Sequence, residues 1–176
     1  MSNTIDDPKA PFVPNYLLYL LAAASEAASA RFHSHVRTRG LRVPEWRVMA
    51  CLTDTDGSMV TELARYAMIE QSRLTKIIIQ MDARGLVTRR SDPTDGRRVR
   101  VFLPPQGRAL AGELVADARA HELIHRPIDR PALGDGSEIK DTLRALIRHL
   151  EADQPGQVGQ PGVADSPARD AAIADS

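Results

Sequence analysis

The segment with the clearest chemistry is a polar turn, DPTDG, followed at once by two arginines. Stretches of alternating apolar and polar residues flank it, which places Arg97 and Arg98 beside the tip of a predicted β-hairpin. Guanidinium groups at such a tip suit a narrow minor groove of DNA. Asp95 precedes Arg97 by two residues, and we expect it to hold the Arg97 side chain extended. The alternative is a surface turn with a neutralised charge pair.

A second polar set lies at helical spacing just before this hairpin. The pattern predicts a helix from Gln71 to about Arg84 that ends at Gly85, with an apolar face of Leu74, Ile77, Ile78 and Met81. The outward face carries groups that can bond base edges or phosphates, or meet a thymine methyl: Gln71, Ser72, Arg73, Thr75, Lys76, Ile79 and Gln80. The alternative is a solvated helix face without a partner.

A short helix before residue 71 completes a helix-turn-helix. Thr61 is expected to cap the helix TELARYA, and a tight turn at 68–70 leads into the longer helix. This arrangement lays its second helix in a DNA major groove. Glu70 suits the positive end of that helix but would repel phosphate, so we expect it to point away from a duplex.

The remaining elements must position these two segments. Pro44 is expected to open a helix that ends at the loop 54–58, and strands at 86–91 and 97–103 form the two-stranded hairpin, with Val99, Val101 and Leu103 on one face. Further helices are predicted at about 15–37, capped by Asn15, at about 104–126 and at about 137–151. The fold class is therefore mainly α with a small β-hairpin wing.

One motif points to different chemistry. His121, Glu122 and His125 form H-E-x-x-H, the spacing that puts two zinc ligands on one helix face. A catalytic zinc needs a third protein ligand, and Glu138 or Asp141 could supply it only if the last helix folds back. A zinc-dependent peptidase is thus the enzyme alternative, and a metal-sensing regulator is another. We expect no enzyme, no metal site and no cofactor.

Cysteine usage and charge narrow the function classes. The lone Cys51 excludes an intramolecular disulfide, and we interpret it as a core residue, with a peroxide sensor as the alternative. The 23 basic residues balance 23 acidic ones, yet nine basic and only three acidic residues lie between Arg73 and Arg108. This basic module in an otherwise acidic chain is a possible polyanion footprint. An acidic amino terminus and short apolar runs predict a cytoplasmic protein with no membrane partner.

The chain strongly resembles the MarR family of winged-helix transcriptional regulators. The resemblance rests on PEWRVMACLTD and on VTELARYAMIEQSRLTKIIIQMDARGLVTRRSDPTDGRRVRVFLPPQGRAL, and extends loosely over 15–151. It implies a homodimer that binds double-stranded DNA through a lobe at about 44–103, with dimerisation helices at about 15–39 and 104–151. An extended arm at 1–14 and a disordered tail at 152–176 are expected outside this domain.

The resemblance also implies a small-molecule effector. Phe32, His33 and Trp46 fall near the place where related regulators bind effectors, and an acidic effector has candidate anchors in Arg31, Arg37, Arg39 and Arg47. We therefore expect a repressor that releases a pseudo-palindromic operator when it binds an aromatic or phenolic acid, or its thioester. A constitutive architectural protein without an effector is the remaining alternative.

Overall fold

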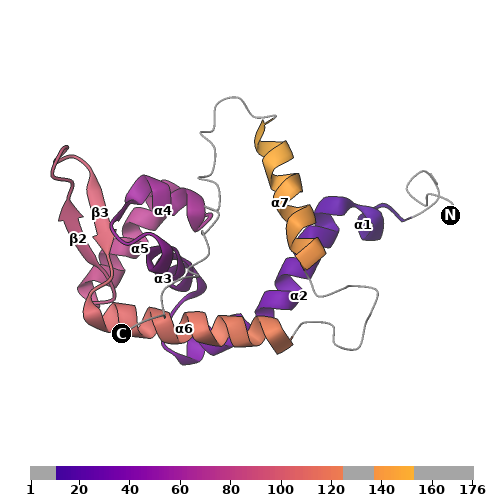
Figure 1. The fold of residues 1–176 in the computed structure, drawn as a ribbon, viewed down its shortest axis with the longest axis horizontal. Coiled ribbons are helices and arrows are strands. Elements are labelled where there is room, and N and C mark those ends of the chain that lie inside the picture. The colour runs from indigo at the N-terminus through magenta and orange to yellow at the C-terminus, as the bar shows by residue number, and fades with distance from the viewer. Residues whose placement is uncertain (1–10, 125–136, 153–176) are drawn as a thin grey trace, which may run out of the picture. The chain divides into compact units, whose positions relative to one another are not determined.

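The computed structural model describes residues 11–124 and 137–152 (Figure 1). The chain divides into two compact units, Met1–Arg126 and Pro127–Ser176. The expected tail after Ala152 and the first ten residues of the expected arm lie outside the described ranges. No helix in these ranges is long and apolar enough to span a membrane.

The described part of the first unit begins with a helical turn and a long helix. The turn, α1, spans Phe12–Asn15, and α2 spans Leu17–Thr38. The expected extended arm is therefore wrong at residues 12–14: prolines are tolerated in the first turn of a helix, where their missing N–H leaves no bond unmade. The predicted cap is also wrong. Asn15 donates instead to the carbonyl of Pro11 at 2.7 Å, and Tyr16 precedes α2 without a side-chain cap.

Helix α3 spans Val43–Asp54 and confirms the helix predicted from Pro44. Proline lies in its first turn, where its fixed φ suits a helix start. Its inner face buries Val48, Met49 and Leu52. These side chains belong to one core that continues into the helices and the sheet that follow.

The predicted helix-turn-helix is confirmed by α4, Val60–Tyr66, and α5, Gln71–Ala83. Every residue assigned to the apolar face of α5 is buried: Leu74, Ile77, Ile78 and Met81. The cap of α4 differs from the prediction, because the helix begins before Thr61. The Glu62 carboxylate accepts the backbone N–H of Met59 at 2.8 Å and closes the first turn from inside the helix.

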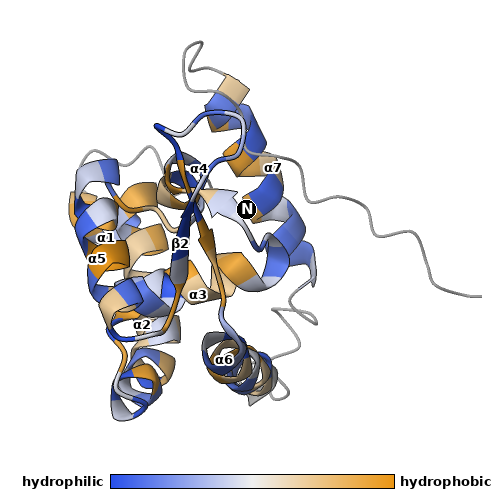
Figure 2. Cartoon of the chain, turned by 90° about the vertical axis from the view of Figure 1, so that its left-hand side faces the viewer, coloured by the Kyte–Doolittle hydropathy of each residue, from blue (hydrophilic) through white to orange (hydrophobic). Residues whose placement is uncertain are grey.

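The wing is a three-stranded antiparallel sheet, where the sequence predicts a two-stranded hairpin. Strands β1 (Ser58–Met59), β2 (Thr88–Ser91) and β3 (Val99–Phe102) are ordered β1-β3-β2. The register pairs Ser58 with Val101 and Arg90 with Arg100. Strand β1 has only two residues, too few for an alternating pattern to show. The edge strand β2 is strongly hydrophilic (Figure 2).

Helix α6 spans Pro105–Ile124 and contacts both α2 and α3 (Figure 1). A Cβ atom on Gly107 would lie 2.2 Å from the carbonyl oxygen of Leu86. Only glycine therefore allows the first turn of α6 to lie against that backbone. Asp56 joins the same region to the wing, because it pairs with Arg108 and accepts the Leu103 N–H at 2.8 Å.

In the second unit, the structure describes one helix, α7, at Ser137–Ala152. It confirms the helix predicted at about 137–151. Within the unit, four apolar side chains recur along α7 at helical spacing and are exposed: Ile139, Leu143, Ile147 and Leu150.

Candidate nucleic-acid interface and the comparisons with known proteins

Helix α5 begins with an acidic cap. The Glu70 carboxylate accepts hydrogen bonds from the backbone N–H of Ser72 at 2.8 Å and of Arg73 at 2.9 Å, and from the Ser72 hydroxyl. The Ser72 hydroxyl and these two amides lower the pKa of Glu70 to about 2, so the carboxylate is ionised at neutral pH. The chain's own carboxylate thus occupies the amides that an external phosphate would otherwise contact.

The outward face of α5 is exposed as predicted. Gln71, Ser72, Arg73, Thr75, Lys76, Ile79 and Gln80 are all accessible to solvent. The Thr75 hydroxyl donates to the Gln71 carbonyl at 2.9 Å, which orients it along the helix. The face therefore combines two cations, two hydroxyls, two amides and one apolar side chain, a set suited to both phosphate and base contacts.

The turn of the wing corrects the expected pairing of Asp95. Its carboxylate lies 3.1 Å from Nε of Arg98, and from Arg97 it accepts the backbone N–H, also at 3.1 Å. The Arg98 guanidinium also points a nitrogen at Sδ of Met59, 3.8 Å away. Among the described residues, the Arg97 guanidinium has no hydrogen bond or ion pair. The turn places the acceptor beside residue 98, so Asp95 orients Arg98 and leaves Arg97 available.

A buried carboxylate that sequence reasoning missed supports this turn. Asp92 accepts the backbone N–H of Thr94 at 2.8 Å and of Asp95 at 3.1 Å, and it pairs with Arg100. Hydrogen bonds from Thr94, then from Arg100, lower its pKa well below the usual range. Arg100 also donates to the carbonyl of Gly57 at 3.1 Å. Asp92 thereby connects the tip of the wing to its base.

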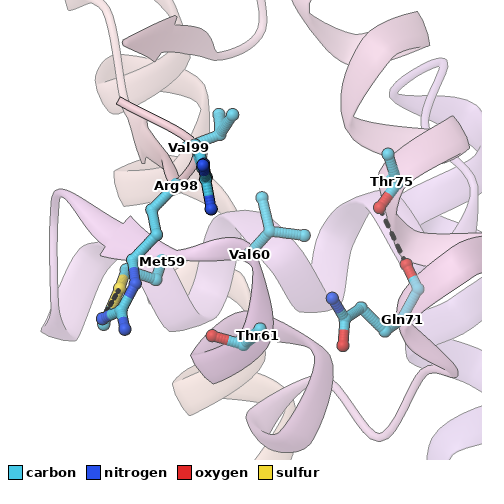
Figure 3. A pocket seen from close by; sticks show the side chains of 8 residues that line it. Met59, Val60, Thr61, Gln71, Thr75, Arg98 and Val99 are labelled. Atoms are coloured by element: carbon cyan, nitrogen blue, oxygen red, sulfur yellow. Dashed lines mark hydrogen bonds between the residues drawn. The ribbon is translucent and has the colours of Figure 1, made fainter. Parts of the chain in front are cut away.

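A groove of about 420 Å³ separates α5 from the wing (Figure 3). Gln71 and Thr75 line one side and Arg98 and Val99 the other, with Val60 and Thr61 of α4 between them. The full lining is Met59, Val60, Thr61, Gln71, Thr75, Arg97, Arg98 and Val99. Four of the eight predicted DNA-binding residues therefore share one groove. The other four, Ser72, Arg73, Lys76 and Asp95, lie outside its lining.

A smaller pocket of about 240 Å³ lies between α2 and α6. It is lined by Arg31, Phe32, His35, Asp117, Ala120 and His121, and we call it the α2–α6 pocket. Nε2 of His35 lies 2.8 Å from Oδ2 of Asp117 across it. His35 and Asp117 are 82 residues apart, so no local pattern could have revealed the pair.

The three predicted effector contacts occupy different positions around this pocket. Phe32 lines it, and Trp46 packs edge-on against the Phe32 ring with centroids 5.3 Å apart. His33 is not part of the lining. Burial and the charges of Arg47 and Arg37 lower the pKa of His33, which favours its neutral form.

Only part of the H-E-x-x-H motif lies among the described residues. His121 packs near Phe32, with ring centroids 5.7 Å apart, whereas His125 lies outside the described residues. Across 11–124 and 137–152, no group of three His, Cys, Asp or Glu side chains is placed to hold a metal ion.

Burial, with a contribution from Asp54, raises the pKa of Cys51 to about 11. The thiol is therefore protonated at neutral pH, which opposes peroxide sensing.

Comparisons with known proteins extend these observations. Residues 41–99 match the MarR family. Over 141 residues the chain is 32% identical to the homoprotocatechuate degradative operon repressor of Escherichia coli, a match that covers 80% of this chain and 95% of that protein. It is 28% identical over 109 residues to the HTH-type transcriptional regulator TtmR of Methylorubrum extorquens, covering 62% of this chain but only 55% of the relative.

Two solved structures show the same fold. A MarR family transcriptional regulator of Silicibacter pomeroyi DSS-3 has 57% sequence identity and a TM-score of 0.70, over 80% of this chain and 99% of that one. Bordetella bronchiseptica BpsR, whose DNA binding is regulated by 6-hydroxynicotinic acid, has 27% identity and a TM-score of 0.64, over 74% and 97%. Together with the helix-turn-helix and the wing, these matches show that the chain belongs to the MarR family of DNA-binding transcriptional regulators.

Proposed function

We propose that this regulator is a homodimeric repressor whose two winged lobes bind a pseudo-palindromic operator and release it when an aromatic acid, or its thioester, binds the helical body. The observation that carries the proposal is the groove in which Gln71 and Thr75 of α5 face Arg97 and Arg98 of the wing. One duplex backbone in this groove would place α5 in the major groove and the wing tip at the neighbouring minor groove.

Each polar group then has a distinct part in binding. Lys76 and Arg73 on the outward face neutralise phosphate or read guanine, and Gln71 and Thr75 bond the backbone or base edges. Arg97, which has no partner among the described side chains, extends into the minor groove. Arg98 is oriented by Asp95 at 3.1 Å and meets the phosphates that border the groove.

Exposed apolar surface supports a second copy of the chain as the partner. Helix α1 and the start of α2 carry several large apolar side chains that are each about half exposed: Val13, Leu17, Leu18, Tyr19 and Leu20. So many large exposed apolar side chains close together in the chain support an interface here. In the other unit, the apolar side chains along α7 are also exposed, and burying them in an interface would likewise be favourable. A homodimer built through these helices buries both sets.

The α2–α6 pocket suits an aromatic acid. Phe32 offers a ring face or edge, Arg31 offers a guanidinium for a carboxylate, and the His35–Asp117 pair offers polar atoms for a ring hydroxyl. The names of two similar proteins refer to such compounds, homoprotocatechuate and 6-hydroxynicotinic acid. To weaken operator binding a hundredfold, the effector must bind the DNA-free dimer more tightly than the DNA-bound dimer by about 2.7 kcal/mol.

Selection from a random-sequence duplex pool, followed by ligand release, tests the proposal. The purified chain should enrich an inverted repeat, and homoprotocatechuate or 6-hydroxynicotinic acid should release the enriched duplex. Arg31→Gln should abolish release by these probes while retaining the duplex, because Arg31 lines the pocket and not the groove. A chain that enriches no duplex contradicts the proposal; enrichment without release by either acid contradicts the effector assignment.

A further inference from the structure

A buried carboxylate joins the start of α3 to the end of α5. Glu45 is completely inaccessible to solvent, and its Oε1 lies 2.8 Å from Nη2 of Arg42 and 2.9 Å from Nη1 of Arg84. Its Oε2 accepts the backbone N–H of Arg42 at 2.7 Å. Burial alone would raise the pKa of Glu45, but hydrogen bonds from Arg42 and the two guanidinium charges outweigh burial and lower it. The carboxylate is therefore ionised, and it accepts three hydrogen bonds.

Both arginines that pair with Glu45 are also connected to the carboxyl end of α5. Arg84 directly follows α5, and its Nη2 donates to the carbonyl of Gly40 at 2.7 Å. Arg42 donates to Oε1 of Gln80, on α5 itself, at 2.6 Å. Arg84 and Arg42 thus connect the carboxyl end of α5 to the same buried oxygen atom, Oε1 of Glu45.

The two ends of α5 are held differently. At the amino end, the partners of the Glu70 carboxylate among the described residues, Ser72 and Arg73, lie on α5 itself, so this cap bonds the helix to no other element. At the carboxyl end, the Glu45 cluster bonds α5 to a different helix. Base contacts depend on hydrogen bonds within a narrow range of distance and angle, whereas phosphate attraction falls off gradually with distance. An error in the direction of α5 therefore affects base reading more than it affects non-specific binding.

We propose that Glu45 is a positioning residue for sequence recognition: its carboxylate, through Arg84 and Arg42, sets the direction in which α5 presents its outward side chains to the bases. This inference rests on the proposed function, because it concerns the same helix and the same operator. It adds that operator specificity depends on a group that cannot itself touch DNA.

The test compares specific with non-specific binding in Glu45→Gln. Fluorescence anisotropy measures the Kd for a duplex that the wild-type chain selects from a random pool, and for a scrambled duplex, at several salt concentrations. We expect Glu45→Gln to weaken specific binding about tenfold, the typical size of one lost base contact, and to leave scrambled binding and the salt slope unchanged. Arg84→Gln should have the same signature, and the double variant should be little worse than either single variant.

Two controls separate positioning from loss of folded protein. Leu114→Ala destabilises the core in α6, and any unfolded fraction lowers the affinity for both duplexes equally. Asp82→Asn makes the same acid-to-amide change on α5 but breaks only the exposed pair with Arg89, so it should leave specificity intact. If Glu45→Gln fails to fold, Arg84→Gln carries the test, since its side chain is 45% exposed.

The outcomes are distinguishable. An equal loss of affinity for both duplexes, or an unchanged Kd for the selected duplex, overturns the positioning role and leaves the proposed function standing. A wild-type chain that enriches no duplex overturns the proposed function, and the positioning role with it.

Discussion

At the residue scale, the two wing arginines differ in what holds them. Asp95 and the sulfur of Met59 approach the Arg98 guanidinium, whereas the Arg97 guanidinium has no partner among the described residues. A guanidinium without an intramolecular partner breaks no ion pair of its own when it binds DNA. Arg98 must retain or replace an existing ion pair. We therefore propose that Arg97 makes the larger part of the DNA contact at the wing tip.

Arg97→Ala tests this assignment. We expect the Kd for a selected duplex to rise about tenfold and the slope of log Kd against log salt to fall by about one, because one phosphate-region cation is lost. Arg89→Ala is the matched control, since it removes the same charge from β2 at a residue that pairs with Asp82 outside the groove. Equal effects of the two variants in a salt titration would show that the wing contributes only net charge.

At the element scale, two glycines of α6 give a matched pair. A methyl group at position 107 would meet the Leu86 carbonyl at 2.2 Å, whereas position 112 has open space around it. Gly107→Ala should therefore lower the free energy of unfolding by about 2 kcal/mol or more. Gly112→Ala should raise it by about 0.5–1 kcal/mol through helix propensity. Urea denaturation measures both, and a stable Gly107→Ala protein would contradict the packing of α6 on Leu86.

The cap of α5 predicts a dependence of stability on pH. The pKa of Glu70 is lowered from 4.5 to about 2, so its contribution is complete above pH 4.5 and is lost as the pH falls towards 2. Glu70→Gln should lower the Tm at pH 7 and narrow the gap to the wild type as the pH falls through that window. Ser72→Ala removes the hydroxyl that donates to Glu70, so the loss of Tm in acid should begin at a higher pH. Parallel Tm curves for the wild type and Glu70→Gln from pH 7 to 2 would contradict the cap.

The elements that carry DNA binding could be predicted because their patterns are local. The apolar face of α5 follows from Leu74, Ile77, Ile78 and Met81 at helical spacing, and each is buried. Strand β1 could not be predicted, because its two residues become a strand only through pairing with β3. The expected cap by Thr61 failed for the same reason, since the helix starts where that short strand ends.

The contacts that orient the site were harder to predict. Asp95 has two arginines within three residues, and only the conformation of the turn decides that its carboxylate meets Arg98. Asp92 and Glu45 read as ordinary surface acids in the sequence, yet both are buried and bonded. The Glu45–Arg84 and His35–Asp117 pairs join residues 39 and 82 positions apart, which no local pattern can connect.

At the scale of the whole molecule, the exposed apolar helices predict the assembly state. Leu20 on α2 is 47% exposed and lies among other exposed apolar side chains. Leu20→Glu places a charge on this surface and should shift dimers towards monomers at micromolar concentration. Ser34 is an exposed residue in the carboxyl-terminal half of the same helix, away from these side chains, so Ser34→Glu should leave the dimer intact. Light scattering measures the mass, and a wild-type monomer would contradict the proposed dimer.

The central claim is that two symmetry-related copies of the chain bind one duplex, each through its α5 and its wing. Hydroxyl-radical footprinting of the selected duplex tests it most directly. We predict two equivalent protected regions about one helical turn apart, each with an outer minor-groove contact that disappears in Arg97→Ala. A single protected region, or the same footprint with and without Arg97, would contradict the claim.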